Sequence, residues 1–258
     1  MIFVMDIGNT NIKSGLFDGT SLTQYWRIST NRQSTSDEYG ITLEDMFRHS
    51  KVDMKAVEGI VISSVVPTVN YTIDHMCRDF FGIDPMFVTP GIKTGINIRY
   101  ENPRELGSDR ICNAVAAYTN HGGPCIYIDF GTATTFGAVD GSGTFLGGCI
   151  CPGIRIASEA LVTGTAKLPH FELVKPDAVI AKNTISNLQS GLIYGYVGQV
   201  EYIVARMKEE IGEKNVKVVA TGGFAHLITT ETKVIDVIDG MLTLKGLRII
   251  YEKNALPR

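Results

Sequence analysis

The sequence lacks the short motifs of several common enzyme folds. No Gly-x-Ser-x-Gly, Walker lysine motif or Gly-x-Gly-x-x-Gly occurs in its 258 residues, which counts against a serine hydrolase, a P-loop enzyme and a Rossmann enzyme. The five histidines show neither metal-ligand nor catalytic-triad spacing. A basic excess is also missing, because the net charge is -3, and this argues against a nucleic-acid-binding surface.

Long apolar runs are absent as well. No stretch approaches the length of a membrane span, and Met1 leads straight into an apolar strand pattern instead of a signal peptide. We therefore expect a cytoplasmic protein whose five cysteines are reduced thiols in core or strand positions. The chain is long enough to form two domains of ordinary size.

Apolar runs separated by turn residues predict two clusters of strands, and apolar residues at helical spacing predict helices after each cluster. This order indicates an α/β protein with two domains, 1–118 and 119–258, each a mixed sheet flanked by helices; the terminal helix is free to pack back on the first domain. The predicted strands are 2–6, 12–17, 21–28, 59–66, 86–88, 125–130, 133–139, 144–151 and 216–220. The predicted helices begin near 36, 68, 108 and 153, with two more over 184–211 and 241–256.

The long predicted helix over 184–211 contains Gly191, Gly195 and Gly198. Each glycine costs up to about 1 kcal/mol relative to alanine inside a helix. We interpret the three as sites of close packing against another helix, either in this chain or in a second subunit.

One short pattern occurs twice, once after each first strand. An apolar run ends in Asp6 and a Gly-Asn-Thr turn, and a second run ends in Asp129 and a Gly-Thr-Ala-Thr turn. A carboxylate at a strand end can hold hydrated Mg²⁺ while the amides of the turn approach phosphate oxygens, and Lys13 would add a positive charge. One such turn alone is equally well explained as an ordinary hairpin. Its repetition favours nucleotide chemistry in two related half-molecules.

The segment Gly107-Ser108-Asp109-Arg110 opens a predicted helix. An acid in the first turn of a helix is favoured by electrostatics alone, which is one explanation of Asp109. The other is a general base that orients an acceptor hydroxyl during phosphoryl transfer. Arg110 or the helix amides would then suit an acidic acceptor.

Seven short motifs are spread from residue 6 to residue 184. They are Asp6-x-Gly8-Asn9-Thr10, Gly91-Ile92-Lys93-Thr94-Gly95, Tyr100-Glu101-Asn102-Pro103, Gly107-Ser108-Asp109-Arg110, Asp129-Phe130-Gly131-Thr132-Ala133-Thr134, Gly147-Gly148 with Pro152-Gly153, and Lys182-Asn183-Thr184. With them the chain resembles the type III pantothenate kinases of the acetate kinase, sugar kinase, Hsp70 and actin superfamily. The resemblance implies two actin-like (ribonuclease H-like) domains around a central cleft. It also implies ATP-dependent phosphorylation of pantothenate, the first step of coenzyme A biosynthesis.

The same resemblance implies cofactors, partners and site residues. The cofactors are Mg²⁺ with ATP and a monovalent cation, K⁺ or NH₄⁺; the partners are ATP, pantothenate and a second copy in a homodimer, with no nucleic acid or membrane. Asp109 would be the catalytic base, Asp129 would hold the monovalent cation, and Asp6 would hold Mg²⁺ through water. The implied ATP-binding residues are Asp6, Ile7, Gly8, Asn9, Thr10, Asn11, Ile12, Lys13 and Thr132. The implied pantothenate-binding residues are Tyr100, Gly107, Ser108, Asp109, Arg110 and Thr184.

Ser108 departs from the family pattern, which usually has alanine there. We expect little effect, because serine is small. Two other functions stay open. One is a kinase of the same superfamily that acts on another small hydroxylated acid or a sugar. The other is a nucleotide-sensing regulator with this fold, although the presence of Asp6, Asp109 and Asp129 argues against it.

Overall fold

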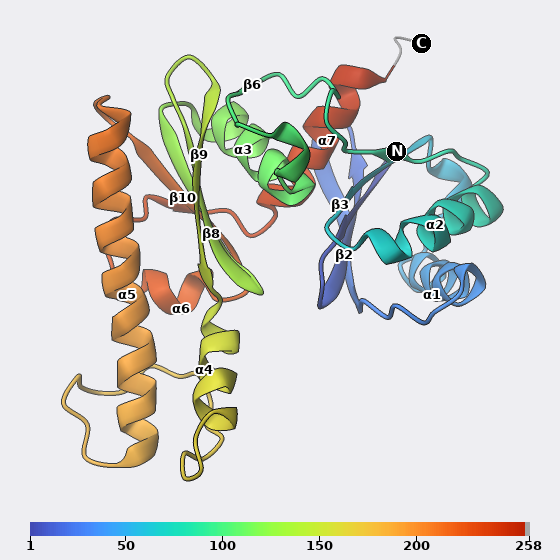
Figure 1. The fold of residues 1–258 in the computed structure, drawn as a ribbon. Coiled ribbons are helices and arrows are strands. Elements are labelled where there is room, and N and C mark those ends of the chain that lie inside the picture. Colours follow the sequence, from blue (N-terminus) through green and yellow to red (C-terminus); the bar gives the residue numbers. More distant parts are fainter. Residues whose placement is uncertain (256–258) are drawn as a thin grey trace. The chain divides into compact units, whose positions relative to one another are not determined.

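The computed structural model describes residues 1–255, which form two compact units (Figure 1). Unit 1 contains Met1–Gly95, Glu101–Ala116 and the segment that begins at Leu242; unit 2 contains Ile96–Tyr100 and Ala117–Met241. The division therefore falls two residues before position 118 and assigns the last helix to the first unit. The predicted end of that helix at residue 256 lies outside the described residues. No helix within residues 1–255 is long and apolar enough to cross a bilayer.

Unit 1 is built on a mixed sheet with strand order β3-β2-β1-β4-β5. The central strand β1 pairs antiparallel with β2 and parallel with β4, and β5 is parallel to β4. The predicted strands of the first half are thus confirmed, and the strands are β1 (Ile2–Ile7), β2 (Asn11–Asp18), β3 (Ser21–Ser29), β4 (Gly59–Ser64) and β5 (Met86–Phe87).

Helices cover both faces of this sheet (Figure 1). Phe3, Met5 and Ile7 alternate along β1 and share a buried core with α1 and α2. The opposite face, which carries Val4, packs against α7, since a Cβ on Gly15 would lie 3.1 Å from Leu244 and 3.4 Å from Val4. The helical segments are α1 (Ser36–His49), η1 (Met54–Ala56), α2 (Pro67–Met76), η2 (Cys77–Phe81), η3 (Pro103–Glu105), α3 (Ser108–His121) and α7 (Leu242–Asn254).

Unit 2 repeats this topology. Its sheet has the order β11-β10-β7-β8-β9-β6, and β9-β8-β7-β10-β11 matches β3-β2-β1-β4-β5 in both order and direction. The prediction of two related half-molecules is therefore confirmed at the level of topology. The strands are β6 (Asn97–Ile98), β7 (Cys125–Phe130), β8 (Ala133–Val139), β9 (Thr144–Pro152), β10 (Lys217–Gly222) and β11 (Val237–Ile238). The sequence did not predict β6, β11 or the short helix α6 (Ala225–Thr229).

The helix α5 (Thr184–Ile211) runs beside the strands of unit 2, and its first turns extend past them together with α4 (Ile154–Thr163) (Figure 1). Its inner side contributes Ile193, Val200 and Val204 to the core. Gly191, Gly195 and Gly198 are exposed, and a Cβ on any of them would meet no atom within 4 Å. Close packing of these glycines within the described part of the chain is therefore wrong, and only the second-subunit alternative remains.

Candidate active site

The first predicted carboxylate lies at the end of the central strand of unit 1. Asp6 is paired in register with Lys13 on β2 and with Ser63 on β4, so the three side chains point to the same face of the sheet. This is the face that carries Val4 and packs against α7. Asp6 is only 8% exposed. A buried carboxylate is thus placed in a row with a cation on one side and a hydroxyl on the other.

The turn after Asp6 is held by backbone hydrogen bonds on both sides. The amide of Gly8 donates to the carbonyl of Asn11 at 3.0 Å, and a Cβ on Gly8 would lie 3.1 Å from that oxygen. Thr30, beyond the end of β3, donates its amide to the Thr10 carbonyl at 3.0 Å and its hydroxyl to the Gly8 carbonyl at 2.6 Å. The predicted ATP-binding turn therefore has a backbone of defined shape.

The start of α3 is joined directly to the end of β4. The hydroxyl of Ser108 accepts from the Ser64 amide at 3.0 Å, donates to the Ser64 carbonyl at 3.2 Å and lies 3.0 Å from the hydroxyl of Ser63. Asp109 follows, and its Oδ1 accepts from the Arg110 amide at 2.8 Å. The serine that departs from the family pattern thus connects the Asp109 helix to the strand next to Asp6.

Cys112 shows that the two carboxylates of unit 1 lie near each other. The pKa of its thiol is raised well above the usual value, first by complete burial and then by the negative charges of Asp6 and Asp109. A hydrogen bond with Ser63 acts in the opposite direction. Charges affect a pKa only over a short range inside a protein. The structure therefore brings Asp6 and Asp109, far apart in sequence, around one thiol.

Sequence reasoning missed three residues of this site: Ser63, Cys112 and Arg32. Arg32 donates from Nη2 to Oδ1 of Asn9 at 3.0 Å. The strand pattern over 59–66 placed Ser63 on a strand, but its position beside Asp6 depends on the register of the sheet. No spacing in the sequence indicates that the chain returns to the first turn after β3. The contact of Arg32 with that turn could therefore not be predicted from the sequence.

The second predicted carboxylate has an equivalent position in unit 2. Asp129 is paired in register with Thr135 on β8 and with Thr221 on β10. Gly222 comes after Thr221 on β10 and has φ +93°. Its backbone lies so close to β7 that a Cβ on Gly222 would be 2.6 Å from Oδ1 of Asp129 and 2.5 Å from the carbonyl oxygen of Phe130. Only glycine fits this backbone, both because of the positive φ and because of the contact. The carboxylate and carbonyl oxygens therefore face a narrow space bounded by main chain.

The donor atoms at both aspartates suit hard cations. The groups around Asp129 are a carboxylate, a carbonyl and two threonine hydroxyls, which are the oxygen ligands that such cations prefer. At Asp6, one carboxylate beside a serine hydroxyl is typical of Mg²⁺, which keeps most of its water. Within residues 1–255, no group of three or more His, Cys, Asp or Glu side chains is arranged to bind a metal on its own.

The remaining predicted residues are distributed over unit 2. Thr132 lies in the turn after Asp129, where a Cβ on Gly153 would meet its carbonyl oxygen at 2.0 Å. Tyr100 follows β6 and stacks on Phe145 with ring centroids 6.4 Å apart. Thr184 is the exposed first residue of α5, which begins at the N-cap Asn183.

Thr184 lies far along α5 from the Asp129 turn. The helix reaches the end of β9 at Tyr196, whose hydroxyl donates to the Pro152 carbonyl at 2.8 Å. At 1.5 Å per residue, Thr184 is roughly 18 Å further along the helix axis. The fold of unit 2 thus leaves Thr184 separate from the other predicted site residues of that unit.

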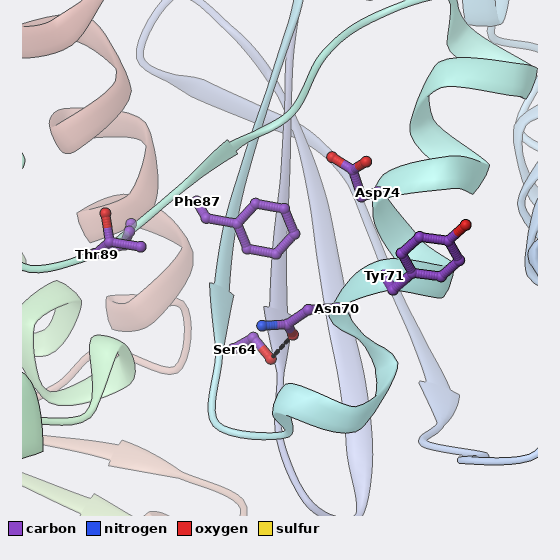
Figure 2. A pocket seen from close by; sticks show the side chains of 7 residues that line it. Ser64, Asn70, Tyr71, Asp74, Phe87 and Thr89 are labelled. Atoms are coloured by element: carbon purple, nitrogen blue, oxygen red, sulfur yellow. Dashed lines mark hydrogen bonds between the residues drawn. The ribbon is translucent and has the colours of Figure 1, made fainter.

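A pocket of about 360 Å³ opens in unit 1 beside Ser64 (Figure 2). Its wall on α2 is formed by Asn70, Tyr71 and Asp74, with the Phe87 ring opposite. The Ser64 hydroxyl donates to Oδ1 of Asn70 at 2.6 Å, while the Ser64 backbone bonds Ser108. The pocket and the start of α3 therefore share Ser64.

Comparisons with known proteins agree with this geometry. The family model described as type III pantothenate kinase matches residues 2–206. The chain belongs to this family. Membership makes the chain a kinase, and an ATP-using kinase works with Mg²⁺ bound to its nucleotide. The suspected family is thereby confirmed.

Similar solved structures confirm the actin-like fold. One, described as a Baf family transcriptional activator from Campylobacter jejuni, has a TM-score of 0.63 at 19% identity over 98% of both chains. A second, described as a 2-dehydro-3-deoxygalactonokinase from Sinorhizobium meliloti, has a TM-score of 0.57 at 12% identity over 100% of this chain and 98% of that one. Component A of (R)-2-hydroxyglutaryl-CoA dehydratase from Acidaminococcus fermentans has a TM-score of 0.52 at 14% identity over 97% of both chains. At these identities the likeness concerns the fold alone.

Proposed function

We propose that this protein phosphorylates pantothenate with ATP to give 4'-phosphopantothenate, the first step of coenzyme A biosynthesis, in the cytoplasm. The observation that carries the proposal is the hydrogen bonding of Ser108, the residue before Asp109, to Ser63 and Ser64, because Ser63 is paired in register with Asp6. This supports a phosphate-side role for Asp6 and an acceptor-side role for Asp109. Family membership supports pantothenate as the acceptor. The spacing of the aspartates in the sequence and their burial and charge in the structure support phosphoryl transfer, but they do not indicate which acceptor is phosphorylated.

In the proposed reaction, Asp109 acts as the general base. It orients the 4'-hydroxyl of pantothenate and accepts its proton as the oxygen–phosphorus bond forms and the bond to the leaving ADP breaks. The link from Ser108 to Ser63 and Ser64 holds Asp109 at a fixed distance from the Asp6 row. The partial positive charge at the start of α3 favours the anionic groups of the reaction.

ATP is held by the Asp6–Lys13 turn, in which Gly8 permits close approach of the backbone and Lys13 supplies charge. Mg²⁺ bound with ATP neutralises part of the phosphate charge, and Asp6 would hold it through water. Thr132 is the proposed ATP ligand from unit 2. Asp129 would hold K⁺ or NH₄⁺ with the carbonyl of Phe130, as the oxygen donors around it support.

Pantothenate is proposed to contact Tyr100 and the segment from Gly107 to Arg110. Thr184, which the fold holds apart from the other predicted site residues of its own unit, is proposed to contact pantothenate bound to the second copy of the homodimer. The pocket beside Ser64, which shares that residue with the start of α3, supports space for the uncharged part of the acceptor, because two aromatic rings, an amide and hydroxyls line it together with the carboxylate of Asp74 (Figure 2). Its lining suits the branched, partly apolar chain of pantothenate and not the carboxylate of that chain, which Asp74 would repel. Arg110 is 6% exposed, so contact with the acceptor would involve its edge or its backbone.

We place the proposed homodimer contact on an exposed stripe of α5. The stripe repeats every three or four residues and contains Thr184, Leu188, Gly191, Gly195, Gly198 and Tyr202. Tyr202 is 69% exposed and the glycines are open, as expected of a surface that a second helix covers closely. A partner on this stripe would also contact Thr184. Sedimentation velocity tests the assignment, and a monomer at micromolar concentration would contradict it.

The test of the function is a phosphoryl-transfer assay with ATP, Mg²⁺, K⁺ and pantothenate, run on the wild type and on Asp109→Asn. We expect turnover in the wild type and a loss of about 10²-fold or more in the variant, the scale of a lost general base. Asp37→Asn is the matched control, because Asp37 is also an acid in the first turn of a helix of unit 1. It should leave turnover unchanged.

Three outcomes would contradict the proposal. Near-normal turnover of Asp109→Asn would reduce Asp109 to a helix-start residue. Turnover of another hydroxylated acid or sugar, but not of pantothenate, in a substrate panel would favour the other kinase. Binding of ATP with no transfer to any acceptor would favour the nucleotide-sensing regulator.

A further inference from the structure

Arg32 contacts the turn between β1 and β2 and has no role in the proposed function described so far. It lies beyond β3, in the segment that returns to the turn between β1 and β2. Two hydrogen bonds from Thr30 fasten this segment to the carbonyls of Gly8 and Thr10. The position of Arg32 relative to the turn is therefore set by the backbone.

The segment is also anchored from the side of α1. Tyr39, which is 3% exposed, donates its hydroxyl to the Asn31 carbonyl at 2.7 Å and accepts from the Asn31 amide at 3.0 Å. The side chain of Asn31 accepts from the Gln33 amide at 3.0 Å. Because both neighbours of Arg32 are hydrogen-bonded, the arginine side chain begins from a backbone that has little freedom.

The guanidinium of Arg32 reaches the turn itself, where Nη2 donates to Oδ1 of Asn9 at 3.0 Å. An arginine can only donate, so this contact turns the amide nitrogen of Asn9 away from it. A guanidinium has five N–H groups, and Asn9 occupies one. Among residues 1–255, Arg32 forms no ion pair with a carboxylate. The guanidinium of Arg32, which has no carboxylate partner among these residues, is thus held against the turn that is proposed to bind the phosphates of ATP.

We propose that Arg32 is a phosphate-binding residue that contacts the β- or γ-phosphate of ATP, with Asn9 holding it in place. This rests on the proposed function only in taking ATP as the nucleotide. A planar guanidinium suits the oxygens of a phosphate better than an ammonium does. Arg32 then supplies charge from the β3 side of the turn, and Lys13 supplies it from β2.

The test measures equilibrium binding of ATP, ADP and AMP, each with Mg²⁺, to the intact protein by titration calorimetry without acceptor. Arg32→Gln should weaken ATP binding by about tenfold, the lower range for a charge-assisted hydrogen bond because the side chain is exposed and screened. ADP binding should weaken equally where the contact is to the β-phosphate and stay as in the wild type where it is to the γ-phosphate. AMP should bind as it does to the wild type. Arg32→Lys should recover part of the loss. Arg48→Gln is the control, since Arg48 is an exposed arginine at the other end of α1, paired with Asp45.

Two results would overturn the proposal. Unchanged ATP affinity in Arg32→Gln would remove Arg32 from the phosphate site. An equal loss for AMP and ATP would mean that the variant alters the turn and not a terminal phosphate contact. Since no acceptor is present, these results are independent of pantothenate turnover. A wild-type protein that binds ATP but fails to phosphorylate pantothenate would contradict the proposed function and leave the Arg32 measurement valid.

Discussion

The crossing of α3 and α7 offers a sharp test of how the site is supported, through the substitution Gly246→Ala. A Cβ at position 246 would lie 2.0 Å from the carbonyl oxygen of Cys112, 2.6 Å from its carbon and 2.9 Å from its Cα. All three are backbone atoms of α3, so no side-chain rotation relieves the contact. The contact of 2.0 Å must open by about 1.4 Å to reach ordinary van der Waals distance, so the helices must separate.

Separation of the helices would also stretch the hydrogen bond from the Thr243 hydroxyl to Oδ1 of Asn113, which is 2.8 Å long and buried. Overpacking costs about 1–3 kcal/mol, and weakening a buried hydrogen bond costs about 1–3 kcal/mol more. Alanine gains up to about 1 kcal/mol over glycine in helix propensity. We therefore expect Gly246→Ala to lower the free energy of unfolding by about 1–6 kcal/mol.

Urea unfolding followed by circular dichroism measures this change, and Thr243→Val serves as the control for the hydrogen bond alone. Thr243→Val should cost less than Gly246→Ala, because it adds no contact with the α3 backbone. Turnover of Gly246→Ala should also fall, since α3 carries Asp109 and a shift of about 1 Å at a reacting group costs up to 10²-fold. Wild-type stability of Gly246→Ala would refute the contact geometry. Lost stability with full turnover would refute the dependence of the site on this crossing.

Two further predictions concern the cation and the buried thiols. Asp129→Ala should abolish activation by K⁺ and keep the circular dichroism spectrum, and full K⁺ dependence of turnover in this variant would place the cation elsewhere. The pKa of Cys77 and of Cys125 is raised to about 12 by burial, and that of Cys112 is raised by burial and by the charges of Asp6 and Asp109. Raised folded-state pKa values mean that the stabilisation is complete below the unfolded value near 9 and is lost as the pH rises from 9 towards 12. The free energy of unfolding should fall by about 1.4 kcal/mol per pH unit for each thiol in that window, and a flat profile would contradict their burial.

Much of the fold follows from local patterns in the sequence. The continuous apolar runs along 2–6 and 125–130 and the helical period over 184–211 predicted β1, β7 and α5 to within a residue or two, because both strands are buried and the helix buries one face. The short strands β6 and β11 escaped prediction, since a two-residue strand has no period. Each exists only because a neighbouring strand offers its edge. Tertiary pairing, which the local pattern does not encode, creates them.

Candidate site residues could be predicted where a reactive side chain lies next to a turn or a helix start in the sequence. Asp6 and Asp129 each end a strand pattern, and Asp109 lies at a predicted helix start, so the sequence alone singled out all three as candidates, and the structure has β1, β7 and α3 at these positions. Ser63 and Cys112 were missed because their role depends on strand register and on which face of α3 meets the sheet. The glycines of α5 show the opposite failure: the sequence predicted that they pack closely, but a Cβ on Gly191, Gly195 or Gly198 would meet no atom within 4 Å.

The difference between the two turns explains why the chemistry is assigned to unit 1. The closing pairs are Ile7–Ile12 and Phe130–Thr134, so four residues form the first turn and three the second. Ser64 and Gly222 occupy equivalent places, each beside the residue that follows the aspartate. In unit 2, Gly222 closes the backbone against Asp129, which favours a bound cation. In unit 1, Ser64 binds Ser108 and so draws the helix of Asp109 to the end of the sheet. One topology thus accounts for the proposed cation position in one unit and for the proposed general base beside the proposed phosphate turn in the other.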